Sequence, residues 1–80
     1  MKMYCVMDKK QNIFNRPFPC ENDIIAQRQF TTAANDSSTE VHHYPDEFDL
    51  YRVGSFDDTN GQFTNDQIFI VNAKTVQIQG

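Results

Sequence analysis

The sequence predicts an α+β domain in which one helix packs on a small, largely antiparallel sheet. Three features indicate it: alternating side chains in residues 2–7, apolar residues at helical spacing in 22–35, and an Asn60-Gly61 turn signal. With 80 residues, the whole chain (1–80) is expected to form one domain. A domain of this size buries only roughly 60% of its unfolded surface. We therefore expect self-association, with a dimer favoured.

The first quarter of the chain is expected to be extended. Side chains in residues 2–7 alternate in the manner of a half-buried strand. A polar turn is expected at residues 8–12. Pro17 and Pro19 exclude a helix from residues 13–20 and favour an extended segment.

The helix is expected between two asparagines. Asn22 is a good N-cap residue, and Asp23 complements the positive end of the helix behind it. Asn35 tolerates the left-handed conformation of a C-cap and is the expected stop. The residues expected to face the sheet are Ala26, Phe30, Ala33 and Ala34, with Ile25 at the edge of their stripe.

The middle of the chain shows weaker patterns. Residues 36–44 have no clear period and predict a mobile loop. Residues 45–48 begin with proline and are compatible with a single helical turn. Residues 49–57 have apolar side chains on both faces of an expected strand.

The last third is expected to form a hairpin. Asn60 and Gly61 both tolerate positive φ, so the chain should reverse there. The returning strand would run through residues 62–64 to residues 68–71, which are rich enough in β-branched and aromatic side chains for a central strand. The expected order is β-α-β-β, which a second turn at 72–74 and an edge strand containing Val76 and Ile78 would extend to β-α-β-β-β.

Composition points to an untargeted cytosolic chain. No apolar run approaches the roughly 18 residues of a membrane span, and no charged-then-apolar leader is visible. Cys5 and Cys20 are too few for a disulfide scaffold and are expected to be reduced and buried.

Charge is distributed unevenly along the chain. The net charge is −4, yet residues 1–35 carry five Lys or Arg against three Asp or Glu. Residues 36–66 carry eight Asp or Glu against a single Arg. Because phosphate contacts require local cations, a nucleic-acid surface is expected only on the N-terminal half.

Several chemical sites are excluded by spacing. An EF-hand reading of the segment around Gly61 would place Phe56 and Gln67 where carboxylates are needed. His42 and His43 do not have zinc-ligand spacing with the cysteines. With three glycines in the chain, there is no phosphate-cradling loop. We expect no metal, no cofactor and no catalysis.

One group of residues suggests DNA binding. Cations that track a backbone, interleaved with aromatic rings that stack bases, are typical of single-strand binding proteins. The alternative is that the phenylalanines are core residues and the lysines only solubilise a turn. The candidate DNA-binding residues are Lys9, Lys10, Phe14, Arg16, Phe18 and Arg28, which Tyr51 and Arg52 could extend across the sheet.

The order of several short motifs resembles a small phage family. The motifs are Tyr4-x-Val6-x-Asp8, Phe14-x-x-Pro17-Phe18, Ala26-x-Arg28-x-Phe30, and Pro45-x-x-Phe48-x-Leu50-Tyr51-x-Val53-Gly54-x-Phe56-Asp57-Asp58 followed by Gly61. Together they resemble the small nonstructural protein of gokushoviruses, single-stranded DNA phages of the microvirus group. The resemblance implies a non-virion, DNA-binding protein that supports genome replication or packaging in the cytoplasm of the host bacterium.

The leading hypothesis is therefore a homodimeric accessory protein that binds single-stranded DNA without catalysis. An alternative is a protein-interaction adaptor, in which the acidic face of residues 36–66 docks on phage replication or capsid proteins. A host-directed inhibitor that mimics the charge of DNA would use the same face. No membrane partner is expected.

Overall fold

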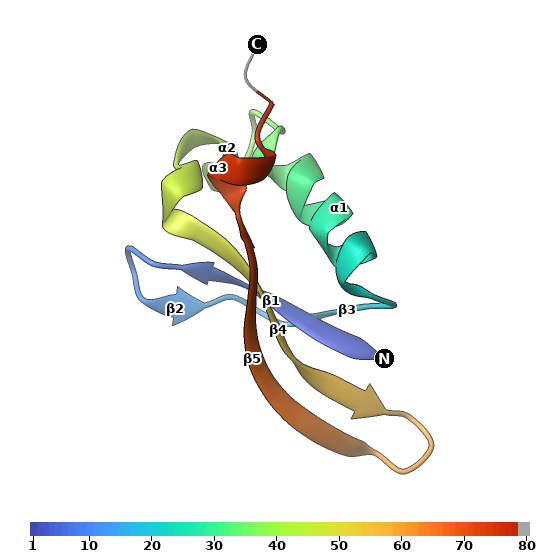
Figure 1. The fold of residues 1–80 in the computed structure, drawn as a ribbon. Helices are drawn as coiled ribbons and strands as arrows, with labels where there is room; N and C mark the ends of the chain where they lie inside the picture. Colours follow the sequence, from blue (N-terminus) through green and yellow to red (C-terminus); the bar gives the residue numbers. More distant parts are fainter. Residues whose placement is uncertain (79–80) are drawn as a thin grey trace.

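A five-stranded antiparallel sheet forms one layer of the protein, and α1 packs across one of its faces (Figure 1). The computed structural model describes residues 1–78. The strands are β1 (Lys2–Asp8), β2 (Ile13–Phe14), β3 (Phe18–Cys20), β4 (Phe48–Asp57) and β5 (Gln62–Asn72). The helices are α1 (Asp23–Ala34), α2 (Glu40–His43), the 3-10 turn η1 (Pro45–Glu47) and α3 (Ala73–Val76). The predicted α+β class is confirmed.

The strand order is β2-β1-β4-β5, so β1 and β4 form the centre of the sheet. The short strands β2 and β3 both pair with β1, β2 at its C-terminal end and β3 at its N-terminal end. The two prolines therefore do lie in an extended segment, as predicted. That segment forms an interrupted edge, because proline cannot donate a ladder hydrogen bond.

The hydrophobic core lies between the sheet and α1. Tyr4 and Leu50 are fully buried there, against Ala26 and Phe30 of the helix. α3 closes the core with the buried Ala73. No helix of residues 1–78 covers the opposite face of the sheet (Figure 1); we call it the open face.

α1 begins as predicted and ends differently. The Asn22 side chain accepts a hydrogen bond from the Ile25 amide at 2.9 Å, which caps the helix. Asn35 does follow the last helical residue, but its φ is −107°, so it is not a left-handed cap. Instead, its side-chain amide donates to the Thr31 and Val76 carbonyls, which ties the helix end to α3.

Three expectations for the rest of the chain are wrong. Residues 36–44 contain the short helix α2, because Thr39 caps it and Asp36 organises the turn before it. The segment with Val76 and Ile78 is not an edge strand, because Asn72 caps α3 and turns the chain away. β5, expected to be central, is the edge strand.

The hairpin between β4 and β5 is confirmed. Gly61 has a φ of +74°, whereas Asn60 does not adopt positive φ and instead accepts a hydrogen bond from the Gln62 amide at 2.9 Å. The Gly61 amide donates to the Asp57 carbonyl at 2.8 Å. The one-turn η1 beginning at proline is also as expected.

Candidate nucleic-acid interface

Three aromatic rings from three strands form a row on the open face. The Phe14 and Tyr51 ring centroids are 5.3 Å apart, and those of Tyr51 and Phe69 are 5.9 Å apart. Both pairs meet edge to face, which is a favourable arrangement of aromatic quadrupoles. We call Phe14, Tyr51 and Phe69 the aromatic stripe.

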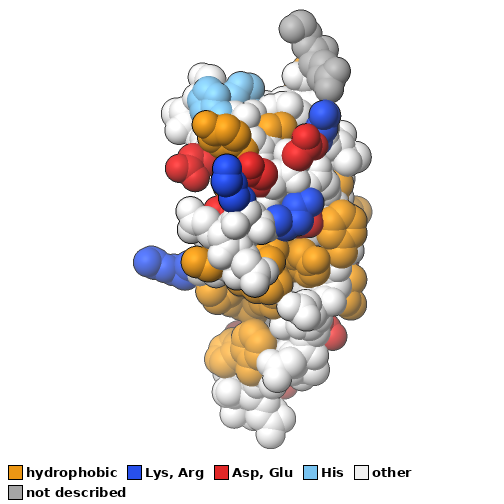
Figure 2. All heavy atoms as spheres, turned by 90° about the vertical axis from the view of Figure 1, so that its left-hand side faces the viewer, with side chains coloured by type: hydrophobic (Ala, Val, Ile, Leu, Met, Phe, Trp, Pro, Cys, Tyr) orange, Lys and Arg blue, Asp and Glu red, His pale blue; other side chains and the backbone are white. Residues whose placement is uncertain are grey.

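Strand register places the stripe on one face. Phe14 pairs with Met7 of β1, and Cys5, two residues earlier on β1, pairs with Tyr51 of β4. Tyr51 in turn pairs with Phe69 of β5. Since paired residues and residues two apart share a face, all three rings project away from α1. Viewed from that side, hydrophobic side chains form a broad band across the middle of the molecule (Figure 2).

The stripe is open to solvent at both ends. Phe14 is 37% exposed and Phe69 is 53% exposed, while Tyr51 between them is half-buried. Exposed aromatic faces on a sheet can stack the bases of a single strand, because every base has a π-face. The stripe is thus chemically suited to unpaired nucleotides.

Cations lie at the β2 edge of the stripe. Lys9 and Lys10 occupy the turn before β2, and Arg16 lies between β2 and β3; all three are exposed. Asp8 organises that turn by accepting hydrogen bonds from the Lys10 and Gln11 amides. Lys9 Nζ is 3.6 Å from Asp49 Oδ2 but its side chain remains 49% exposed. Within residues 1–78, Lys10 and Arg16 form no salt bridge.

Three predicted site residues lie elsewhere. Phe18 faces α1, with its ring centroid 6.1 Å from that of the buried Tyr4. Arg52 also points to the α1 side, where its guanidinium is bound by two carboxylates. Arg28 is exposed on α1, on the other layer of the protein. The predicted set therefore divides between the two faces of the sheet.

Arg52 belongs to a network that joins α1 to the sheet. Its Nη1 is 2.7 Å from Asp23 Oδ2, and its Nε is 3.7 Å from Asp66 Oδ2. The Tyr4 hydroxyl donates to Asp23 Oδ1 at 2.5 Å. The hydrogen bond from Tyr4, followed by that from Arg52, lowers the pKa of Asp23. Burial and the same hydrogen bond raise the pKa of Tyr4.

These shifts predict how stability changes with pH. The lowered pKa of Asp23 means that its contribution is present above the ordinary aspartate pKa of about 4 and is lost as the pH falls through the folded-state value. The raised pKa of Tyr4 adds a second loss above about pH 10. We expect the Tyr4→Phe variant to lose less stability than the native chain at both low and high pH, because it lacks the hydroxyl that titrates and that donates to Asp23. Urea unfolding from pH 2.5 to 11 measures the free energy of unfolding of both proteins. Identical pH profiles would contradict a contribution of the Tyr4–Asp23 hydrogen bond.

The acidic residues of 36–66 do not form one face. Lys9 lies near Asp49, Lys74 Nζ is 3.6 Å from Asp46 Oδ2, and Arg52 engages Asp66. Other carboxylates lie at the α2–η1 end of the molecule, whereas Asp57 and Asp58 lie near the β4–β5 loop at the opposite end (Figure 1).

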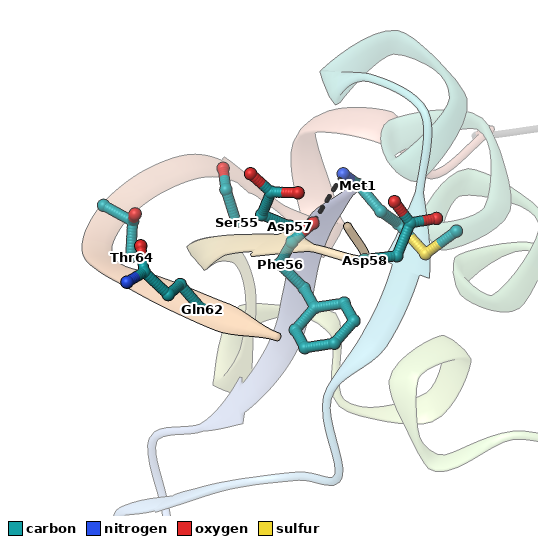
Figure 3. A pocket seen from close by; sticks show the side chains of 7 residues that line it. All are labelled: Met1, Ser55, Phe56, Asp57, Asp58, Gln62 and Thr64. Atoms are coloured by element: carbon teal, nitrogen blue, oxygen red, sulfur yellow. Dashed lines mark hydrogen bonds between the residues drawn. The ribbon is translucent and has the colours of Figure 1, made fainter. Parts of the chain in front are cut away.

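A pocket at the end of the hairpin is acidic. The side chains of Asp57 and Asp58 line it together with Met1, whose amino group donates to the Phe56 carbonyl at 2.9 Å (Figure 3). Hydrogen bonds from Thr59 lower the pKa of Asp57, which keeps it charged. Two carboxylates disfavour phosphate here. In the described part of the chain, no group of three His, Cys, Asp or Glu could hold a metal ion.

Both cysteines are free and buried, as predicted. Burial raises the pKa of each thiol, which favours the protonated form. Cys5 shares the open face with Tyr51, whereas Cys20 belongs to the core under α1. The sheet therefore separates the two sulfur atoms.

Phe69 is the stripe residue that the sequence analysis missed. It lies in the apolar run of residues 68–71, which suggested a buried central strand. Counting residues away from the Asn60-Gly61 turn along both strands would have placed Phe69 near Tyr51 on the partner strand. The irregularities in the β4–β5 register make that count unreliable.

Residues 1–76 match the sequence model of a protein family described as Phage ORF5 protein. No curated protein and no solved structure shows a significant match to the chain. Among residues 1–78, no helix is both long enough and apolar enough to cross a membrane.

Proposed function

Because this chain belongs to the Phage ORF5 protein family, we propose that it is a phage accessory protein that binds single-stranded DNA in the cytoplasm of the host. The family match covers nearly the whole chain and establishes a phage protein. The binding activity, the gokushovirus origin and a role in genome replication or packaging are our proposal.

The aromatic stripe is the observation that carries the proposal. Its rings are held by strand pairing and by one another, so they are positioned before a ligand arrives. Bases would stack on Phe14 and Phe69, with the edge of Tyr51 between them. Lys9, Lys10 and Arg16 would contact phosphates where the strand leaves the sheet at β2. Sequence readout is not expected, because stacking tolerates any base.

The salt dependence of binding tests the electrostatic part. With three cations in contact, log K should fall with log[salt] with a slope of roughly −2, since each phosphate contact on a single strand contributes about −0.7. Fluorescence anisotropy with a labelled oligonucleotide at several salt concentrations measures the slope. An abasic oligonucleotide of equal length is the matched control and should bind more weakly. Absence of binding at low salt would reject the proposed function.

The adaptor and inhibitor alternatives require an acidic surface from residues 36–66. The structure divides these carboxylates between two ends of the molecule, and three of them lie within 4 Å of a lysine or arginine. A DNA mimic acts through a strong negative field over one surface, which carboxylates at opposite ends of the molecule do not concentrate. We therefore favour DNA binding over both alternatives.

A further inference from the structure

β5 is a long edge strand that no other strand of residues 1–78 covers. It is 11 residues long, and residues 62–69 are all exposed. Natural edge strands are normally blocked by lysine, proline, β-bulges or inward-pointing charge. Of these, β5 has two irregularities in its register with β4. β5 contains no lysine or proline, and its one charged residue, Asp66, lies near Arg52. Its free backbone groups, with the exposed Ile68 and Phe69, can accept another strand.

The other edge of the sheet is different. There β1 is covered by the short strands β2 and β3, which are separated by an irregular segment containing Arg16 and Pro17. Lys9 and Lys10 flank the same edge. The sheet thus has one charged, interrupted edge and one long, almost uncharged edge.

We propose that a second copy of this chain pairs with β5 through its own β5, antiparallel and about a two-fold axis near Gln67. Such an axis is perpendicular to the sheet, so both open faces lie on the same side of an extended sheet. Phe69 of each copy then lies beside the junction. Phe69 of one copy lies opposite Asn65 of the other, so the two stripes share one face but are offset along the strands, with the basic β2 edges at the far ends of that face. Because β2 and β3 block the outer edges, assembly stops at the dimer.

Charge at the two ends of β5 selects a second copy in this orientation. The acidic Asp57 and Asp58 precede β5, and Lys74 follows it. Lys74 is exposed and only loosely paired, 3.6 Å from Asp46. Antiparallel pairing brings the acidic end of one β5 toward the Lys74 end of the other. Parallel pairing would place the two acidic ends together. DNA is not the expected occupant of this edge, because the two nearby cations among the described residues, Arg52 and Lys74, each lie within 4 Å of a carboxylate.

Sedimentation equilibrium of the DNA-free protein tests the dimer. The Gln67→Glu variant places like charges opposite each other at the axis and should weaken dimerisation by about fivefold. Gln29→Glu, at an exposed position on α1, makes the same chemical change away from β5 and should leave the dimer intact. Equal effects of the two variants, or a native chain that is monomeric at all concentrations, would overturn the proposal.

A charge exchange tests the orientation. Asp58→Lys and Lys74→Glu should each weaken the dimer, and the double variant, whose net charge equals that of the native chain, should recover it. Lack of recovery would overturn the antiparallel arrangement. The use of this shared aromatic face for DNA rests on the proposed function, whereas the dimer itself does not. A monomer that still binds DNA would therefore reject this inference and leave the proposed function standing.

Discussion

Replacing Phe14 and Phe69 together by alanine is expected to weaken single-stranded DNA binding by roughly 30-fold or more, because each stacked ring contributes about 1–3 kcal/mol. Both rings are exposed at the ends of the stripe, so their removal should change the core little. The loss should appear at every salt concentration, with the salt slope unchanged. Anisotropy titrations of the native and variant proteins measure both quantities.

A matched control separates stacking from general loss of aromatic surface. Tyr44 is an aromatic residue with 58% exposure that lies between α2 and η1 and takes no part in the stripe. Tyr44→Ala should bind DNA like the native chain. If this variant and the Phe14→Ala, Phe69→Ala double variant lose equal affinity, the stripe is not the binding surface.

Substitution of Gly54 by alanine is expected to destabilise the fold by about 1–3 kcal/mol through overpacking. Gly54 is buried in β4, where the register with β1 and β5 shifts. A Cβ atom there would collide with the Thr64 carbonyl oxygen and the Phe63 ring. The oxygen belongs to the backbone of β5, so relief requires the hairpin itself to move. Urea denaturation measures the change, which is large beside a total stability of roughly 4–12 kcal/mol.

Gly61 provides the control, because glycine is favoured there by the positive φ and not by a lack of space. Its φ is +74° and no atom lies near the position of an added Cβ. Asparagine tolerates positive φ better than most residues, so Gly61→Asn should destabilise the fold less than Gly54→Ala does. Gly54→Asn should be at least as harmful as Gly54→Ala. Similar effects at the two glycines would show that close approach of β5 is not the reason for Gly54.

Local chemistry explains which elements could be recognised from the chain alone. Three such elements depend on residues close together in sequence. They are the Asn22 cap, the buried face of α1 with Ala26 and Phe30, and the turn at Gly61. Their stability comes from nearby hydrogen bonds or helical spacing, and the structure agrees with all three. The same reasoning identified Phe14 and Tyr51 as candidate contacts.

Other features depended on partners far along the chain. β5 is at the edge because β4 pairs with β1 on its other side, which no property of the apolar run 68–71 reveals. The same pairing separated Phe18 and Arg52 from Phe14 and Tyr51, and brought Phe69 beside Tyr51.

Composition and spacing were thus sufficient for the α+β class, the boundaries of α1 to within a residue or two, and the basic character of the N-terminal half. Only the folded chain decided which face each ring occupies and which cations are neutralised. The physical reason is that side chains alternate across a strand. A register shift of one residue moves a ring to the opposite face, and register is set by long-range pairing.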